Sequence, residues 1–371
     1  MKLSNVLSLT ALLFVNNAYS LNQNDAQHAT NQLWDKLRGQ GGCLFSKHLS
    51  SNAPSQNLAA LWLRAVFHDA GTYDASAKTG GLDASVQLTS ESSSSVNKGL
   101  PGSFGSLSIR QDIPISKADA IALAGVVTLS SCRVCDATNT SESPFVAFSS
   151  GRADATSPNL MDNLPHDPFG TVDTIYPGFQ RMGLNKVDML VLVTGSHSLG
   201  GAHAAISPLL TNKTFVPFDS TPGIFDNDVF KQVLAGNCVN PFDCTMARNA
   251  DLKPYVQLYA SNQTAFFTQY QASFEKMLAL TASPLSQPIH LNITCFAHNA
   301  GQGGGPNGGG INGGGKNGGG NQGGGAPKAG GQNGTASGGG APPAGKGGKG
   351  GKAPSHKGPG ARRGRKGHGP K

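Results

Sequence analysis

The C-terminal part of this chain of 371 residues lacks aromatic residues and contains no aspartate or glutamate. From Asn299 onward it holds 32 of the 51 glycines and 11 of the 29 lysines and arginines. Such a segment loses much backbone entropy on ordering and gains little burial in return. We therefore expect residues 299–371 to form a disordered, glycine-rich, basic tail. The glycines keep no period of three, which excludes collagen.

Long apolar runs are also missing, since no stretch reaches the roughly 18 residues that a membrane-spanning helix needs. The N-terminus starts with Met1 and Lys2, continues with an apolar run from Val6 to Val15, and reaches small residues at Ala18 and Ser20. This order is typical of a signal peptide at residues 1–20. We predict a protein secreted to the extracellular space, with a buried N-terminal helix as the alternative.

Positive charge is scarce outside the tail, although the whole chain has a formal charge of +8. Without the tail, 18 basic residues face 21 acidic ones, so the body is mildly acidic. The basic sequence pI of about 9.2 therefore indicates no specific nucleic-acid partner. We expect a monomer whose tail binds an anionic cell-wall or matrix polymer, with mere spacing or solubility as the alternative.

Cysteine is limited to six residues: Cys43, Cys132, Cys135, Cys238, Cys244 and Cys295. In a secreted protein they are expected to form disulfides, and 15 pairings are open. A metal site at Cys132 and Cys135 is disfavoured because no second pair completes four ligands. Export as a glycoprotein agrees with five sequons, at Asn139, Asn212, Asn262, Asn292 and Asn333.

Strand-like alternation is rare between residues 21 and 298, and helical periodicity prevails. We predict a mainly α domain with helices at 25–39, 55–70, 117–131, 185–196, 228–235 and 254–280. Asn185 is the expected N-cap of the fourth of these helices. The stretches 73–85, 138–168 and 208–226 have no apolar period and are predicted to be loops.

The stretch from Leu61 to Ala70 concentrates polar chemistry on an apolar helix. Arg64 and His68 are four residues apart, so they lie on one helical face with Phe67 beside them. A buried guanidinium is costly unless an anion accompanies it, and Asp69 is one such partner. A structural ion pair and a functional site both remain open for this stretch alone.

A second histidine follows the apolar helix at 185–196, in the string Thr194-Gly-Ser-His197-Ser-Leu-Gly200. An Arg-x-x-Phe-His-Asp motif followed about 130 residues later by such a string resembles the secreted haem peroxidases of the plant, fungal and bacterial superfamily. The resemblance runs from Leu33 to Met277 and is closest to the fungal secretory branch, class II. It implies about ten helices, with haem b between a distal and a proximal helical half.

The resemblance also assigns roles to individual residues. Arg64 and His68 would be the distal catalytic pair, with Phe67 beside them and His197 as the axial ligand of the haem iron. Asn97 would hold His68 and be supported by Glu91, and Asp243 would accept a hydrogen bond from His197. Two calcium ions are implied as well. Their ligands would be Asp69, Gly81, Asp83 and Ser85 on the distal side, and Ser198, Asp219, Thr221, Ile224 and Asp226 on the proximal side.

The function implied is reduction of hydrogen peroxide through a ferryl intermediate, coupled to oxidation of two one-electron donors. Acidic residues that would bind Mn²⁺ are replaced by Asn57 and Leu61, and Leu192 stands where lignin-oxidising members have a surface tryptophan. Small phenol-like reductants are therefore the expected donors. The alternative is a wall-anchored or matrix-anchored protein in which the peroxidase body has a structural role or low activity.

Overall fold

The computed structural model describes residues 20–43, 57–135 and 146–296. The predicted signal peptide, except Ser20, and the predicted tail from residue 299 lie outside these ranges. The described residues form eleven α-helices, five short 3₁₀ helices and one pair of two-residue strands. The α-helices are α1 Gln23–Gly39, α2 Leu58–Ala70, α3 Thr89–Ser92, α4 Pro101–Phe104, α5 Lys117–Ser131, α6 Val172–Arg181, α7 Lys186–Val193, α8 Asp228–Leu234, α9 Pro241–Arg248, α10 Lys253–Ser261 and α11 Gln263–Leu278.

The remaining elements are η1 Ser85–Gln87, η2 Ser95–Asn97, η3 Gly105–Leu107, η4 Met161–Asn163, η5 Gly195–Ser198, and the antiparallel strands β1 Gly201–Ala202 and β2 Val216–Pro217. The expectation of a mainly α domain with about ten helices is confirmed. Within the described ranges, no helix is both long and apolar enough to cross a membrane.

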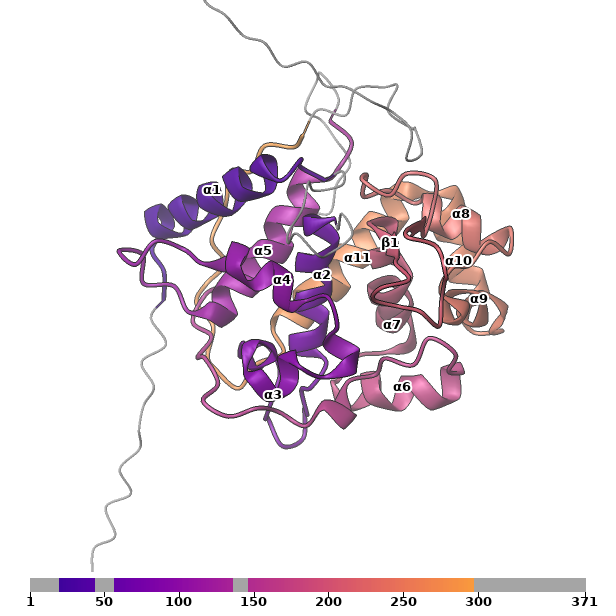
Figure 1. Cartoon of the computed structure of the whole chain (residues 1–371), viewed down its shortest axis with the longest axis horizontal. Coiled ribbons are helices and arrows are strands. Elements are labelled where there is room, and N and C mark those ends of the chain that lie inside the picture. The colour runs from indigo at the N-terminus through magenta and orange to yellow at the C-terminus, as the bar shows by residue number, and fades with distance from the viewer. Residues whose placement is uncertain (1–19, 44–56, 136–145, 297–371) are drawn as a thin grey trace, which may run out of the picture. The chain divides into compact units, whose positions relative to one another are not determined.

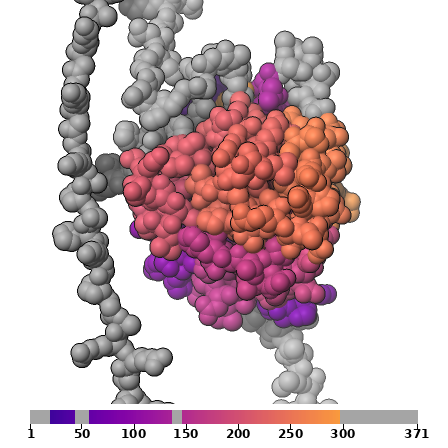
Figure 2. Space-filling view, turned by 90° about the vertical axis from the view of Figure 1, so that its right-hand side faces the viewer, coloured from indigo at the N-terminus to yellow at the C-terminus, as the bar shows by residue number. Residues whose placement is uncertain are grey.

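The helices form two groups joined by α11. In the first half of the chain, α2 packs on α5 and α5 on α1, while in the second half α8 packs on α10 and α6 on α7 (Figure 1). Helix α11 contacts α2, α7 and α10, so it lies between the groups. Figure 2 shows the face built by the later residues, coloured from magenta to orange. The core is continuous across both groups.

Helix α5 is almost entirely buried, and one glycine allows its close packing. A Cβ added to Gly125 would lie 2.8 Å from Val66 of α2 and 2.9 Å from Phe274 of α11. Such distances leave no room for a side chain, so Gly125 lets three helices meet. The N-cap of the helix is Ser116, whose side chain accepts a hydrogen bond from the backbone N–H of Asp119.

Helix α7 begins at a capping box. The side chain of Asn185 accepts hydrogen bonds from the backbone N–H groups of Val187 and Asp188, and Asp188 accepts one in return from the N–H of Asn185. The other carboxylate oxygen of Asp188 accepts hydrogen bonds from Ser273 and Lys276 of α11. The cap therefore also fixes α7 against α11, and with it the histidine-bearing turn η5.

The six cysteines form three disulfides: Cys43–Cys132, Cys135–Cys295 and Cys238–Cys244. The expectation of disulfides is thereby confirmed. Cys132 and Cys135 have different partners, so this pair is not available as a metal site.

The C-terminal strap, residues 286–296, runs along α1 without helical structure. The backbone N–H of Phe296 donates to the carbonyl of Ser131. The indole of Trp34 donates to the carbonyl of Thr294 at 2.7 Å, and its ring stacks on Phe296 with centroids 5.1 Å apart. Cys295 adds a covalent link through its disulfide. The strap is thus held to both α1 and the end of α5.

One predicted helix needed correction, and helices α3, α4, α6 and α9 were not predicted. The helix expected at 254–280 is two helices, because Asn262 is extended at φ −138° and its side chain caps α11 by accepting from Ala265 N–H. Helix α6 was not predicted, since Pro177 and Gly178 interrupt its helical signal. It forms because Thr171 and Thr174 make a capping box and Phe179 is buried.

Candidate active site

A cavity of about 720 Å³ opens between the two groups of helices. Arg64, Phe67 and His68 line it from α2, and His197 lines it from η5. Much of the remaining wall is apolar and includes Leu61, Leu192, Leu199, Phe218 and Phe242. A volume between about 300 and 1,000 Å³ with few convergent polar groups is typical of a ligand or cofactor site. The two motifs singled out in the sequence therefore face one cavity.

Arg64 is held by backbone carbonyl oxygens. Its Nη2 donates to the carbonyl of Val96 at 2.7 Å, and its Nη1 donates to the carbonyl of Lys98 at 2.9 Å. Its Nε donates to Nε2 of His68 at 3.2 Å. Burial lowers the pKa of Arg64 to about 10, so the guanidinium is still a cation at neutral pH. No carboxylate among the described residues forms a salt bridge with it.

His68 has a defined tautomer. Its Nδ1 lies 2.6 Å from Oδ1 of Asn97, and Nδ2 of Asn97 donates to the backbone carbonyl of Glu91 at 2.9 Å. The amide oxygen of Asn97 therefore accepts, Nδ1 carries the hydrogen, and Nε2 keeps its lone pair. Burial lowers the pKa of His68 well below its ordinary value, and the charge of Arg64 lowers it further. The imidazole is neutral at physiological pH.

The support of Asn97 differs in detail from the expectation. Glu91 contributes its backbone carbonyl to the amide of Asn97. The Glu91 carboxylate accepts a hydrogen bond from the backbone N–H of Asn159 instead. Burial raises the pKa of the Glu91 carboxyl. Glu91 thus joins the segment carrying Asn97 to the loop that follows residue 158.

His197 is anchored on the opposite side of the cavity by a carboxylate. Its Nδ1 lies 2.8 Å from Oδ2 of Asp243, and the hydroxyl of Thr194 donates to the other oxygen of Asp243 at 2.8 Å. The ring stacks on Phe218 with centroids 4.3 Å apart. This arrangement leaves Nε2 of His197 as the ring nitrogen able to bind a metal. The residues therefore fit a haem iron between His197 and His68.

The turn that carries His197 depends on Gly195. A Cβ at this position would lie 2.7 Å from the ring of Phe266 and 3.0 Å from that of Tyr270. The next residue, Ser196, donates its hydroxyl to the Leu192 carbonyl at 2.6 Å and contacts the hydroxyl of Tyr270 at 2.8 Å. The turn is thus packed directly on α11.

The five residues expected to bind a proximal cation converge. Ser198 donates its hydroxyl to the carbonyl of Ile224 and accepts from the N–H of Asp226. Thr221 donates its hydroxyl to the Asp226 carboxylate at 3.0 Å and its N–H to Oδ1 of Asp219. Oδ2 of Asp219 is buried without a hydrogen-bond partner. Burial and the neighbouring charge of Asp226 raise the pKa of Asp219 to about 8. A hard cation fits these oxygens.

The expected distal set is arranged differently. Both oxygens of Asp69 accept backbone N–H groups, from Asp83, Ala84 and Val86. The side-chain nitrogen of Asn159 donates to both oxygens of Asp83 and, at 2.8 Å, to the hydroxyl of Ser85. Gly81 lies in the same loop, and its N–H donates to the hydroxyl of Thr72. An amide nitrogen therefore already satisfies the oxygens that a cation would use.

Acidic, histidine or cysteine side chains do not meet in threes as a metal site anywhere in the described ranges. A cation at either loop would therefore depend on hydroxyl and carbonyl oxygens as well. Burial raises the pKa of Asp69, and the neighbouring charge of Asp83 raises it further.

Asn159 and His166 were not singled out from the sequence, because both lie in the stretch predicted as a loop and neither belongs to a periodic pattern.

Comparison with known proteins agrees with this geometry. The chain belongs to the peroxidase family, whose model matches residues 45–262. It is therefore an oxidoreductase that acts on hydrogen peroxide, and membership of this haem peroxidase family implies a haem cofactor.

Particular relatives are plant enzymes. The chain is 32% identical over 246 residues to L-ascorbate peroxidase 3 of Arabidopsis thaliana, covering 65% of this chain and 80% of the relative. It is equally identical, over 65% of this chain and 79% of the relative, to the probable L-ascorbate peroxidase 4, peroxisomal, of Oryza sativa subsp. japonica. L-ascorbate peroxidase 2, cytosolic, of Arabidopsis thaliana is 33% identical, with 61% and 86% covered.

Proposed function

We propose that this protein is an exported haem peroxidase that couples hydrogen peroxide reduction to the one-electron oxidation of small phenol-like donors. The observation that carries the proposal is the single cavity bounded by Arg64 and His68 on one side and His197 on the other. Residues 21–298 would form the peroxidase domain, preceded by a signal peptide at 1–20 and followed by a basic tail at 299–371.

Haem b, when bound, supplies the iron that peroxide binds and that stores the oxidising equivalents. His197 would hold the iron through Nε2. Asp243, by accepting the Nδ1 hydrogen, gives the imidazole more negative character and makes it a stronger donor to the metal. Phe218 stacks on the ring of His197 and Phe67 lies beside His68, so both imidazoles keep their orientation.

His68 would move the proton of peroxide. Its Nε2 carries a lone pair, so it can accept a proton from one peroxide oxygen and then deliver it to the other. The low pKa of His68 keeps this nitrogen unprotonated at neutral pH. Arg64 would stabilise the negative charge that develops as the O–O bond breaks, a contribution of about 3 kcal/mol. Its fixation on two carbonyls orients the guanidinium beforehand.

Calcium would support both sides of the cavity. The proximal set, with its unpartnered Asp219 oxygen beside Asp226, supports a cation next to His197. On the distal side, the Asn159 amide would have to rotate and present its oxygen before a cation could replace its nitrogen. We therefore propose two sites, of which the proximal one contributes more to stability.

Export is supported by the leader-like N-terminus and by three disulfides, which persist in oxidising compartments. The sequons at Asn212, Asn262 and Asn292 lie on exposed residues, as glycosylation requires. The relatives named cytosolic or peroxisomal support neither export nor the fungal secretory branch, which rests on the motifs of this chain alone. The basic tail would bind an anionic wall or matrix polymer, and the protein would act as a monomer.

Ascorbate is a second candidate donor, because the relatives carry the name of ascorbate peroxidases. The two donors differ in charge, since phenols are neutral and ascorbate is an anion at neutral pH. The alternative of a wall-anchored or matrix-anchored protein whose peroxidase body has a structural role or low activity predicts slow reaction with peroxide whichever donor is present.

One experiment separates these possibilities. The full-length protein, reconstituted with haem, is mixed with one equivalent of peroxide, and the absorbance near 400 nm is followed before guaiacol or ascorbate is added. We expect the absorbance to change rapidly on addition of peroxide and to return to its starting value faster with guaiacol than with ascorbate. A faster return with ascorbate would make ascorbate, not a phenol, the favoured donor. The absence of any haem band would refute a haem enzyme.

A further inference from the structure

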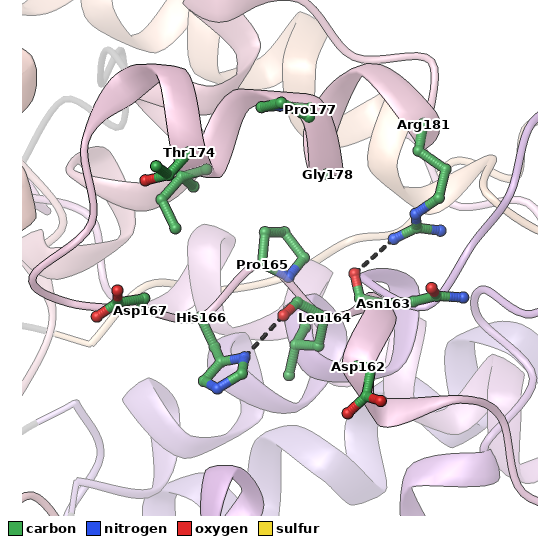
Figure 3. A pocket seen from close by; sticks show the side chains of 11 residues that line it. Asp162, Asn163, Leu164, Pro165, His166, Asp167, Thr174, Pro177, Gly178 and Arg181 are labelled. Carbon is green, nitrogen blue, oxygen red and sulfur yellow. Dashed lines mark hydrogen bonds between the residues drawn. The ribbon is translucent and has the colours of Figure 1, made fainter. Parts of the chain in front are cut away.

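A second cleft, of about 300 Å³, opens beside the main cavity, between the segment 162–167 and helix α6 (Figure 3). The two spaces share the lining residues Pro165, His166, Asp167 and Ile175. The main cavity has an apolar rim nearby, where Phe169 is 55% exposed and Leu209 is 79% exposed. A small molecule in the cleft would therefore border the cavity.

His166 has a defined tautomer and an available nitrogen at this junction. Its Nδ1 lies 2.7 Å from the carbonyl of Leu164, and a carbonyl can only accept, so Nδ1 carries the hydrogen (Figure 3). Nε2 therefore holds a lone pair, and it has no hydrogen-bond partner within the described ranges. The side chain is exposed. His166 thus offers a hydrogen-bond acceptor and base to a molecule bound at the junction.

The lining of the cleft favours a neutral donor over an anion. Its apolar part consists of Leu164, Pro165, Ile175 and Pro177, and its acidic part of Asp162 and Asp167. The cationic group in the lining is Arg181. Its Nη1 donates to the carbonyls of Thr72 and Tyr73, and its Nη2 donates to those of Gly71 and Asn163. The carboxylates of Asp162 and Asp167 repel an anion. Arg181 does not offset this repulsion, because its Nη hydrogens already bind backbone carbonyls. A phenol offers an apolar ring and a hydroxyl donor instead.

We propose that Nε2 of His166 binds the hydroxyl of a phenolic reductant and accepts its proton when the phenol gives up an electron. In this step the phenol O–H bond breaks, one electron passes to the peroxide-oxidised enzyme, the proton goes to Nε2 of His166, and a phenoxyl radical leaves. The inference rests on the proposed phenol-oxidising function and adds a base for its donor half.

The two histidines would divide the proton chemistry. His68 is held at Nδ1 by Asn97 and lines the main cavity, where its Nε2 lone pair lies next to Nε of Arg64. His166 lines the cleft together with Asp162, Asp167 and Arg181, and it lines the main cavity together with Arg64, Lys98 and His68. Positive charge on His166 lowers the pKa of His68 as well.

The test uses the haem-loaded, full-length protein with His166→Gln and His166→Ala, and with His28→Gln as the matched control. His28 is exposed on α1 and lines neither space. The donors are guaiacol, which must lose a proton, and ferrocyanide, which has none to lose. Peroxide consumption by stopped flow and equilibrium binding of p-cresol by NMR are measured in parallel.

We expect both His166 variants to lose roughly 10²-fold in kcat/KM for guaiacol, at the lower limit of general-base catalysis, with an unchanged ferrocyanide rate. p-Cresol binding should weaken about tenfold, and His28→Gln should match the wild type. Equal loss with both donors, or no loss with either, overturns the role of His166. If the wild type oxidises ferrocyanide but no phenol, the proposed donor class is wrong as well.

Discussion

The two sides of the main cavity each hold a histidine by a hydrogen bond at Nδ1, but the partner groups differ in chemistry. Each side fixes an imidazole through Nδ1, but the partner of His68 is the amide of Asn97 and the partner of His197 is the carboxylate of Asp243. An amide orients a ring without adding charge, so His68 remains a neutral base. A carboxylate pushes electron density onto the ring, so His197 is suited to bind a metal. The amide of Asn97 and the carboxylate of Asp243 differ by one atom, and this difference suits His68 to act as a base and His197 to bind a metal.

The partners are themselves supported differently. Asn97 depends on a backbone carbonyl of Glu91, whereas Asp243 depends on the hydroxyl of Thr194, which lies three residues before His197. The proximal support is therefore built into the helix end that carries the ligand. The distal support comes from a separate segment, and the carbonyls of Val96 and Lys98 on either side of Asn97 also hold Arg64 of α2.

The largest effect is expected from removing the distal base. His68→Ala should keep the haem band near 400 nm, because His197 is untouched, but slow the reaction with peroxide roughly 10³-fold. Stopped-flow absorbance measures both. His28→Ala on α1 is the control. If His68→Ala lost both the haem band and the reaction with peroxide, His68 would be needed to bind the haem.

Removing the distal charge should cost less. Arg64→Leu is expected to slow peroxide reaction roughly 10²-fold, because the developing charge on the peroxide oxygen loses its cation. Arg64→Lys should recover part of the rate, since the charge returns without the two-pronged geometry. Equal rates for the leucine and lysine variants would show that shape, not charge, is what Arg64 contributes.

Exchanging the partners tests the comparison directly. Asn97→Asp puts a carboxylate beside His68, which favours the imidazolium and raises its pKa. Below the raised pKa the ring holds a proton and cannot act as a base. The acidic limb of the pH–rate profile should therefore move about 1–2 pH units upward, with roughly tenfold loss on that limb. Asp243→Asn should leave this limb in place and raise the reduction potential of the haem. A profile that does not move would contradict the role of Asn97.

The smallest effect is expected from cations. Chelating calcium should lower the melting temperature by roughly 5–10 °C if calcium was present at about 100 times its Kd. Asp219→Asn should remove most of this difference, whereas Asp83→Asn should remove less, because Asn159 already satisfies the distal oxygens. Chelator sensitivity that persists in Asp219→Asn would reverse this ranking of the sites.

The same prediction has a pH dependence. The pKa of Asp219 is raised to about 8, and an unfolded aspartate titrates near 3.9. Between these values the metal-free folded protein holds a proton that the unfolded chain has lost, so its stability falls as pH rises. The calcium effect on melting temperature should therefore be larger at pH 8 than at pH 5.

The sequence predicted the apolar helices well and their interruptions poorly. Helices α2, α5 and α7 have dense apolar patterns and side-chain caps, and they appear near the predicted ranges. The break at Asn262 was missed because hydrophobic periodicity continues across it. Helix α6 was missed because Pro177 lies inside it, where its local cost is offset by burial.

For the site, spacing alone could align Arg64 with His68 on one helix, but not bring them opposite His197. That step came from resemblance, since no local rule relates residues about 130 positions apart. His166 and Asn159 had no signal, because their positions depend on how the loop between Val146 and Gly170 folds back against α2 and its neighbouring turns. Physical contact, not periodicity, gives these two residues their environment.

The C-terminal strap has a mechanical consequence. Its last described residues are fixed by the Cys135–Cys295 disulfide one position before the Phe296–Trp34 stack. A pulling force on the chain beyond Phe296 would first load the Phe296–Trp34 stack and the hydrogen bond from the Phe296 N–H to the Ser131 carbonyl. It would then load the covalent bond to Cys135, just after α5. The disulfide would carry the force in place of the hydrogen bonds of residues 286–294. Those hydrogen bonds would therefore stay intact while the chain is under tension.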